Sequence, residues 1–212
     1  MSAKKEQSSM PHDPRPQVLY VIGDTFGQRL MEHRGVPPER QVSFEEFRDG
    51  VAPPADVVVA VHSGGDEELR DEIDRICAER GTPSVGLQLQ PTRIVCGPVV
   101  VPGRTACFAC HRKRAAQHAG SARHYDIDAS LSGLSEGFGP QHLAVASGLV
   151  ELALTEIASG VTGIGGTVRT FNLVSGAVSA ASTVSVNRCP RCGDRFAEER
   201  AASAMPVPEL LQ

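Results

Sequence analysis

The chain has 212 residues, enough for one domain with a small appendage. Hydrophobic residues make up 41% of it, but aromatic residues only 4%, and tryptophan is absent, so the core must be built from Val, Ala, Leu and Ile. The formal net charge of −4 argues against broad binding to nucleic acids or to anionic membranes.

The two ends of the sequence differ in composition from the part between them. Residues 1–16 are polar and contain proline, without the apolar run of a signal peptide, and no apolar stretch reaches the roughly 18 residues of a membrane span. We therefore expect a cytoplasmic protein with a disordered tail over 1–16, a folded domain over 17–200 and a flexible tail over 201–212.

The first half of the chain alternates short apolar runs with amphipathic segments. Runs rich in Val and Ile predict buried strands of a parallel sheet, and apolar residues three and four apart predict helices on its faces. Glycines that follow two of the helices suit the left-handed position at which a helix ends. In chain order the sequence predicts a strand over 18–22, a helix over 26–34 ended by Gly35, a strand or a turn of helix over 42–47, a strand over 56–61, a helix over 67–80 ended by Gly81, and a strand over 84–89.

The second half of the chain adds elements of a different kind. A glycine- and serine-rich stretch over 120–139 predicts a mobile loop, and the helix after it has apolar residues around most of its circumference, which is typical of a buried helix. The predicted elements are a strand over 94–101 that bends at Gly97-Pro98, a basic helix over 110–118, the buried helix over 141–160, and a hairpin of strands 167–173 and 177–186. Together they predict an α/β fold, a Rossmann-like parallel sheet with an added antiparallel hairpin.

Two of the six cysteines stand alone, Cys77 and Cys96. Both lie in apolar surroundings, and we expect them to be buried small hydrophobic residues. Six cysteines in a reducing compartment indicate metal or redox chemistry rather than a disulfide framework.

The other four cysteines form two C-x-x-C pairs, Cys107/Cys110 and Cys189/Cys192. The second pair continues as C-P-R-C-G, a zinc-knuckle pattern in which the glycine lets backbone N–H groups turn toward thiolate sulfur. Two knuckles supply four thiolates to a tetrahedral Zn²⁺ and leave no position for water, so the sequence predicts a structural zinc site. Residues 107–111 also spell the C-x-x-C-H haem signature, but haem attachment normally takes place outside the cytosol. A thioredoxin-like redox pair stays open as an alternative, because Cys107 precedes a helix.

The first strand runs into a turn that resembles the start of a nucleotide-binding unit, V-L-Y-V-I-G-D-T-F-G. A dinucleotide fingerprint is G-x-G-x-x-G, but here Thr25 replaces the second glycine. Asp24 places a carboxylate where phosphate would bind at the helix N-terminus, and only Arg29 lies near enough to compensate. We therefore predict a degenerate nucleotide turn at Gly23, Asp24 and Gly27 that does not bind ATP, with residual binding as the alternative.

The sequence offers no pair of nucleophile and general base, so we assign no catalytic residue. The scattered histidines are expected to be surface or packing residues: His111, His118, His124 and His142. The basic run over 112–114, together with His111 and His118, predicts either a solvated helix face or a positive patch for an acidic peptide or partner.

The order of these motifs resembles the ThiF/ubiquitin-activating-enzyme-like superfamily. The resemblance covers roughly residues 17–196, and its most specific piece is G-P-x-V-x-P-G-x-x-x-C-x-x-C-x-x-x-R, from Gly97 to Arg114. D-V-V-V-A at 56–60 and the final C-P-R-C-G also match. Within the superfamily the chain is most similar to the ocin-ThiF-like or cyclodehydratase-partner proteins, which bind leader peptides in the biosynthesis of azole-containing ribosomal peptides.

The resemblance implies a role in making ribosomally synthesised, modified peptides such as bacteriocins. Members of the family bind the leader of the precursor peptide and present its core to a YcaO-type enzyme, which uses ATP to close Cys, Ser or Thr side chains into azolines. The family's zinc ligands match Cys107, Cys110, Cys189 and Cys192. Members often form homodimers, for which the apolar hairpin is a candidate interface.

Two departures from the family pattern shape the functional hypothesis. Many members carry an N-terminal winged-helix-like leader-recognition domain, whereas about sixteen residues precede the first strand here, so leader binding is expected to need another surface or subunit. Adenylating relatives keep a glycine-rich turn and basic ATP-contacting residues that are missing here. We predict a non-catalytic scaffold subunit that engages a YcaO-type cyclodehydratase and the precursor peptide through 111–118, 120–139 or 141–160. The alternatives are an ATP-dependent adenylyltransferase acting on a peptide carboxyl group and a zinc-stabilised redox or regulatory protein.

Overall fold

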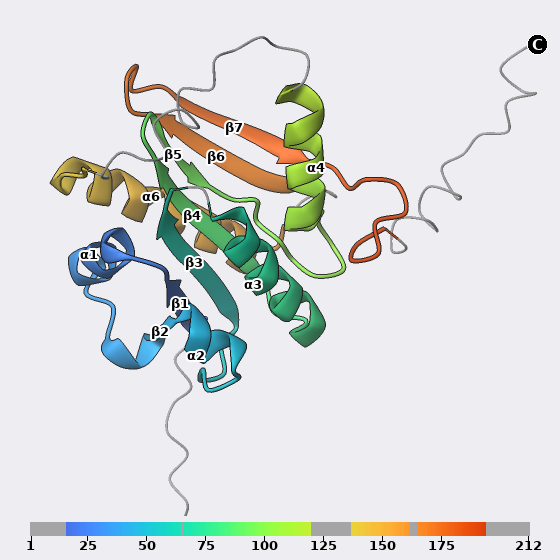
Figure 1. Cartoon of the computed structure of the whole chain (residues 1–212), viewed down its shortest axis with the longest axis horizontal. Helices are drawn as coiled ribbons and strands as arrows, with labels where there is room; N and C mark the ends of the chain where they lie inside the picture. Colours follow the sequence, from blue (N-terminus) through green and yellow to red (C-terminus); the bar gives the residue numbers. More distant parts are fainter. Residues whose placement is uncertain (1–15, 65, 120–136, 162–164, 194–212) are drawn as a thin grey trace, which may run out of the picture.

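The computed structural model describes residues 16–64, 66–119, 137–161 and 165–193. Within these ranges the chain forms one seven-stranded sheet with helices on both faces (Figure 1). The predicted tails and most of the predicted mobile loop lie outside the described residues. None of the described helices is long and apolar enough to cross a membrane.

The first half of the chain builds the parallel part of the sheet. Its elements are β1 (Val18–Ile22), α1 (Thr25–Arg34), the 3-10 helix η1 (Pro38–Arg40), β2 (Gln41–Ser43), α2 (Phe44–Arg48), β3 (Val57–Ser63), α3 (Glu67–Arg80) and β4 (Ser84–Gln90). Strands β2, β1, β3 and β4 lie side by side and parallel. The apolar run in β3 is buried from Val57 to His62, as its composition predicts for a central parallel strand.

The second half of the chain extends the sheet with antiparallel strands. Its elements are β5 (Arg93–Cys96), α4 (Phe108–Ala119), α6 (Pro140–Ala158), β6 (Gly166–Asn172) and β7 (Val178–Thr183). The strand order is β2-β1-β3-β4-β5-β6-β7, and β5, β6 and β7 are each antiparallel to the strand before them. This confirms the predicted α/β class and the late hairpin.

The segment over 42–47, which fits a strand or a helix by its pattern, contains both. Ser43 ends β2 and caps α2: its hydroxyl accepts a hydrogen bond from the Glu46 N–H at 3.2 Å, and the Glu46 carboxylate accepts one from the Ser43 N–H at 2.7 Å. This reciprocal capping box starts a helix immediately after a strand.

The predicted bend at Gly97-Pro98 ends β5. Gly97 has a φ of +132°, and a Cβ there would lie 2.5 Å from the Thr167 carbonyl oxygen, so only glycine fits against β6. Beyond the bend the chain pairs again with β4, where Val100 and Ser84 exchange two backbone hydrogen bonds of 2.8 Å. The segment after the bend connects the sheet to the first cysteine pair.

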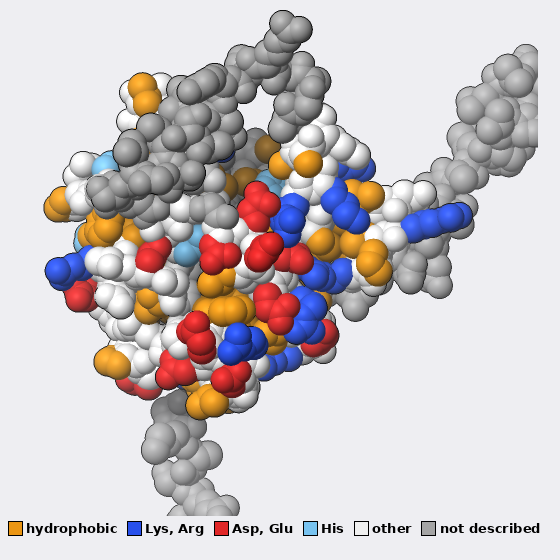
Figure 2. All heavy atoms as spheres, in the orientation of Figure 1, with side chains coloured by type: hydrophobic (Ala, Val, Ile, Leu, Met, Phe, Trp, Pro, Cys, Tyr) orange, Lys and Arg blue, Asp and Glu red, His pale blue; other side chains and the backbone are white. Residues whose placement is uncertain are grey.

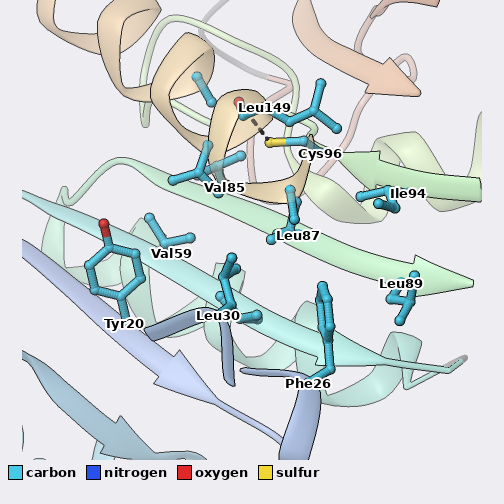
Figure 3. Close-up of a cluster of buried hydrophobic side chains, with 14 of the residues drawn as sticks. Tyr20, Phe26, Leu30, Val59, Val85, Leu87, Leu89, Ile94, Cys96 and Leu149 are labelled. Atoms are coloured by element: carbon cyan, nitrogen blue, oxygen red, sulfur yellow. Dashed lines mark hydrogen bonds between the residues drawn. The ribbon is translucent and has the colours of Figure 1, made fainter. Parts of the chain in front are cut away.

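Two hydrophobic layers cover the sheet. On one face α1 and α6 pack over β3, β4 and β5, and Figure 3 shows their side chains meeting those of the strands, with the Cys96 thiol donating to the Leu149 carbonyl oxygen at 3.5 Å. On the other face α2 and α3 enclose a smaller cluster around Phe47 and Ile73. Helix α4 continues this second layer toward β7 (Figure 1).

The helix over 141–160, which is predicted to be a buried helix, is only partly buried. Helix α6 buries one stripe, made of Ala146, Leu149, Val150 and Ala153, while Leu152 is 53% exposed. The reason is its position: it lies as an outer layer on the sheet beside α1, so only the stripe that faces inward is covered.

Candidate metal centre

Four cysteines that are far apart in the sequence meet beside the start of α4. Cys107 immediately precedes the helix and Cys110 lies in its first turn, while Cys189 and Cys192 lie in the loop after β7. All four are buried, and their sulfur atoms lie within 4.8 Å of one another. The Cys107 and Cys189 sulfurs are 3.6 Å apart, and those of Cys110 and Cys192 are 3.5 Å apart.

The size of this cluster matches that of a metal tetrathiolate. Sulfur ligands about 2.3 Å from a tetrahedral metal ion lie about 3.8 Å from each other, which is slightly more than the separations of 3.5 and 3.6 Å and less than the 4.8 Å within which all four sulfurs lie. Elsewhere in the described ranges, no three or more His, Cys, Asp or Glu side chains form a comparable group. The four cysteines can therefore hold one metal ion with four sulfur ligands.

The second C-x-x-C pair is held in a tight turn. Gly193 donates from its N–H to the Cys189 carbonyl oxygen at 2.6 Å, and a Cβ at Gly193 would lie only 2.3 Å from the Cys189 nitrogen. Arg188, just before the turn, has a φ of +54°. The Val186 N–H donates to Cys110 Sγ at 3.2 Å. The glycine therefore permits the turn, whereas the predicted N–H contact to sulfur comes from the segment before it.

The cysteines perturb one another's ionisation. The hydrogen bond from Cys192 lowers the pKa of Cys107 to about 6, and the same contact raises the pKa of Cys192. Burial raises the pKa of Cys110 to about 11. Since a metal binds thiolates, occupation of the cluster must release protons from Cys110 and Cys192.

A buried carboxylate, which sequence analysis missed, ties the cluster to the sheet. Asp74 on α3 is fully buried and accepts hydrogen bonds from Arg191 at 2.7 Å and from the Phe108 N–H at 3.2 Å. The Ser84 hydroxyl of β4 donates to its other oxygen at 3.4 Å. Arg191, between the two cysteines of the second pair, also pairs with Asp71 at 2.8 Å. Asp74 thus joins α3, β4, the start of α4 and the cysteine turn.

The only sequence signal for this contact is weak. Asp74 lies on the inward side of α3, between buried Ile73 and Ile76 and close to Cys77. Helical spacing predicts an apolar residue at this position. A carboxylate at such a position requires a buried partner, but the partner lies more than a hundred residues away and helical spacing does not identify it.

The predicted nucleotide turn is held closed by its own aspartate. The Asp24 carboxylate accepts from the Gly27 N–H at 3.0 Å, which caps α1, and its second oxygen accepts from the backbone N–H and the hydroxyl of Ser63. These contacts join the carboxyl ends of β1 and β3, the place where the strand order reverses and where open α/β sheets bind ligands. The N–H that would face a phosphate is occupied by a carboxylate.

Neither Gly27 nor Arg29 is left available for a phosphate. A Cβ at Gly27 would lie 2.6 Å from Ile22 Cγ2, so this glycine lets α1 approach β1 closely. Arg29, the nearest basic residue, is exposed and pairs with Glu32 at 2.7 Å.

An open cavity of about 410 Å³ lies next to the turn. It is lined in part by Gly23, Asp24 and Ser43 and by the acidic pair Glu45 and Glu46, and none of its lining residues is basic. Its charge therefore opposes the entry of a polyphosphate.

The basic helix does not form a continuous positive patch among the described residues. Arg112 pairs with Glu67 of α3 at 3.0 Å, and Arg114 donates to the Ser185 carbonyl oxygen at 3.3 Å. Figure 2 shows acidic and basic side chains interspersed on this face of the molecule. This favours the solvated face over the positive patch.

The histidines are dispersed, as predicted for the two whose side chains are described. His111 is partly buried and contacts the Thr183 hydroxyl at 2.9 Å through Nδ1, while His142 accepts from the Gly139 N–H at 3.0 Å and so caps α6. The His118 side chain and His124 lie outside the description.

The two isolated cysteines are buried, as predicted. Cys77 is 1% exposed and Cys96 is fully buried. Burial raises the pKa of each thiol to about 12, so both are neutral and unreactive in the folded protein.

Comparison with known proteins identifies relatives by fold alone. No protein-family profile and no curated protein matches the sequence. A chain of the E. coli microcin synthetase McbBCD complex superposes with a TM-score of 0.56 at 13% identity, over 87% of this chain and 71% of that chain. A heterocyclase in complex with substrate and cofactor gives 0.55 at 17% identity, over 91% of this chain and 28% of that chain. E. coli MccB gives 0.53 at 15% identity, over 84% and 58%.

The chain thus spans less than two thirds of the length of the heterocyclase and of MccB. At these identities the likeness concerns architecture rather than activity. The molecule is an α/β protein with a Rossmann-like fold shared by a chain of a microcin synthetase complex, a heterocyclase and MccB, and it carries a buried four-cysteine cluster that can hold a metal ion.

Proposed function

We propose that the chain is a non-catalytic partner subunit of a YcaO-dependent cyclodehydratase complex, which forms azoline rings in a ribosomally synthesised precursor peptide. The observation that carries this proposal is the fold match to a chain of a microcin synthetase complex, together with the cyclodehydratase-partner resemblance of Gly97 to Arg114. The fold match to a heterocyclase points in the same direction.

The assignment of a non-catalytic role rests on Asp24. A subunit that activates a carboxyl group with ATP needs a phosphate site at the carboxyl ends of the strands. Here a carboxylate hydrogen-bonded to Gly27 and Ser63 lies there, beside a cavity that has only acidic charges in its lining. ATP hydrolysis would then belong to the YcaO subunit.

We propose that the metal is zinc and that its role is structural. Four sulfur ligands fill a tetrahedral shell, so no position is left for water or substrate. The cluster joins α4 to the loop after β7, and Arg191 and Asp74 fasten that loop to α3. Zinc would thereby hold the antiparallel half of the sheet and its covering helix in one arrangement.

A surface for the partner subunit is available on α6. This helix carries Leu152, which is 53% exposed, next to the exposed residue Glu151. We propose α6 as the contact with the YcaO protein; the basic helix over 111–118 and the segment over 120–139 are the other candidates for engaging the partner and the precursor.

Reconstitution tests the proposal. The tagged chain is purified from its native host, and its co-purification with a YcaO protein is tested by peptide mass spectrometry. Ring formation in the precursor is followed by mass spectrometry as the loss of one water per ring. We expect a stable complex, ring formation only when the chain is present, and unchanged ring formation in D24N. Ring formation that proceeds equally well without the chain would refute the proposal.

The second candidate is an adenylyltransferase that acts on a peptide carboxyl group. The position of the cavity, at the carboxyl ends of β1 and β2, favours this activity, whereas its acidic lining opposes it. ATP–pyrophosphate exchange by the purified chain, dependent on precursor peptide, would support this activity. If the purified chain shows no ATP–pyrophosphate exchange but restores ring formation when it is added to the YcaO protein, the result supports the partner subunit over the adenylyltransferase. A redox role for the four cysteines would require free thiols in the native protein, whereas stoichiometric zinc excludes it.

A further inference from the structure

A small cavity lies next to the metal centre, between β3, β4 and the first turns of α3 and α4. Its volume is about 40 Å³, and its walls include His62, Arg70, Gln88, Phe108 and His111. A single water needs roughly 10–15 Å³ of such space, so the cavity has room for about three heavy atoms.

Arg70 is the unusual residue of this cavity. It is only 2% exposed, and its Nη2 donates to the Ser84 hydroxyl at 3.3 Å, but Nε and Nη1 have no hydrogen-bond partner within the described ranges. The guanidinium carbon lies 5.1 Å from the centre of the Phe108 ring. Buried charged donors are nearly always paired, because leaving one unpaired is costly.

The nearby carboxylates are engaged with other groups. Asp74 accepts from Arg191 and from the Phe108 N–H. At the rim of the cavity, Asp66 accepts from the Leu69 N–H at 2.9 Å as the cap of α3, and Glu67 pairs with Arg112. Among the described residues no carboxylate forms an ion pair with Arg70.

The remaining walls are already fixed by their own contacts. His62 donates from Nδ1 to the Ser63 carbonyl oxygen at 3.3 Å, and the Gln88 amide donates to the Gly64 carbonyl oxygen. Gly86 of β4 leaves the space that the guanidinium uses, since a Cβ there would lie 2.7 Å from Arg70 Nε. The cavity is therefore preformed, and Arg70 is the group in it that requires a partner.

We propose that this cavity binds a small free carboxylate, with carboxylate oxygen accepting hydrogen bonds from Arg70. A carboxylate group has three heavy atoms, which matches the volume. Guanidinium binds carboxylate and phosphate through charge-assisted hydrogen bonds, and phosphate is too large for this space. Asp66 and Glu67 at the rim weaken the attraction of an anion from solution, so the affinity is expected to be modest. The proposal is independent of the cyclodehydratase role.

The experiment uses the full, metal-loaded chain and formate as the probe. The Nε–H signals of its arginines are followed by ¹H–¹⁵N NMR while sodium formate is added, against sodium chloride at equal ionic strength. We expect formate, but not chloride, to shift one arginine signal, the one that is missing in R70M. The affinity for formate should fall at least tenfold in R70M and stay unchanged in R75M, which removes an exposed arginine of the same helix.

Two results would overturn the proposal: no arginine signal moves with formate, or R70M binds formate as tightly as the parent protein. If R70M does not fold, G86A replaces it, because its added methyl group intrudes on the guanidinium while the charge is kept. Folded G86A that still binds formate with the parent affinity would likewise refute a site at Arg70.

Discussion

Replacing Asp74 with alanine should destabilise the protein far more than replacing its neighbour Asp71. Both carboxylates contact Arg191, but Asp74 is fully buried and also accepts from Phe108 and Ser84, whereas the Asp71 side chain is 29% exposed. The D74A variant leaves a backbone N–H and part of a guanidinium without partners in the interior.

The expected magnitude follows from these contacts. Removing one partner from a buried ion pair costs about 3–5 kcal/mol. The cost for D74A should lie in that range because the Phe108 N–H also loses its acceptor, which offsets the gain from the Asp71 contact that Arg191 retains. D71A removes a partly buried contact and leaves Arg191 its bond to Asp74, so it should cost about 1 kcal/mol. At about 2–4 °C per kcal/mol for a chain of this size, D74A should lower the melting temperature by about 6–20 °C.

The assay is urea unfolding of the zinc-loaded proteins, followed by circular dichroism, with D71A as the matched control. Equal losses in the free energy of unfolding for D74A and D71A would refute the inference that Asp74 anchors the cysteine turn. A second check uses zinc affinity: D74A should bind zinc more weakly than D71A, because it releases the loop that carries the second cysteine pair.

Three further predictions concern the cluster, the isolated thiols and the acid stability. G193A should bind zinc at least tenfold more weakly, measured by chelator competition, because its Cβ would overlap the backbone of the turn. With zinc bound, a thiol reagent at about pH 8 should label no cysteine; a chelator should expose four, while Cys77 and Cys96, with pKa values of about 12, react only after unfolding. Burial lowers the pKa of His62, so the folded state favours its neutral form; this stabilisation is complete above the unfolded pKa of about 6.5 and is lost as the pH falls below it. When the pH is lowered from about 7.5 to about 5.5, the free energy of unfolding should therefore decrease less in H62N than in the parent protein. In H33N, which changes an exposed position, it should decrease as much as in the parent.

Each of these predictions has a result that contradicts it. G148A is the control for G193A, because an added Cβ at Gly148 meets nothing within 4 Å; equal zinc affinities of the two variants would exclude a role for the tight turn. Six reactive thiols after chelation would mean that Cys77 and Cys96 are accessible. Parallel pH profiles of H62N and the parent would show that His62 does not contribute to acid stability.

The local elements follow from short-range patterns in the sequence. The apolar run in β3 predicts a central strand, and Gly35 and Gly81, with φ of +63° and +69°, end their helices where expected. The two C-x-x-C pairs indicate a metal site because this spacing is typical of cysteines that bind one metal ion together. All these signals depend on residues within one or two turns of each other.

The tertiary structure decided the contacts between distant segments. Asp74 and Arg191 are separated by 117 positions, and neither helical spacing nor the cysteine motif links them. The free donors of Arg70 become evident only when α3, β4 and α4 surround them, and the exposure of Leu152 depends on which side of α6 the sheet covers. Helical periodicity predicts which residues of a helix form its apolar face. Which element covers each face depends on how the whole chain packs, so the burial and pairing of these residues are determined only by the tertiary structure.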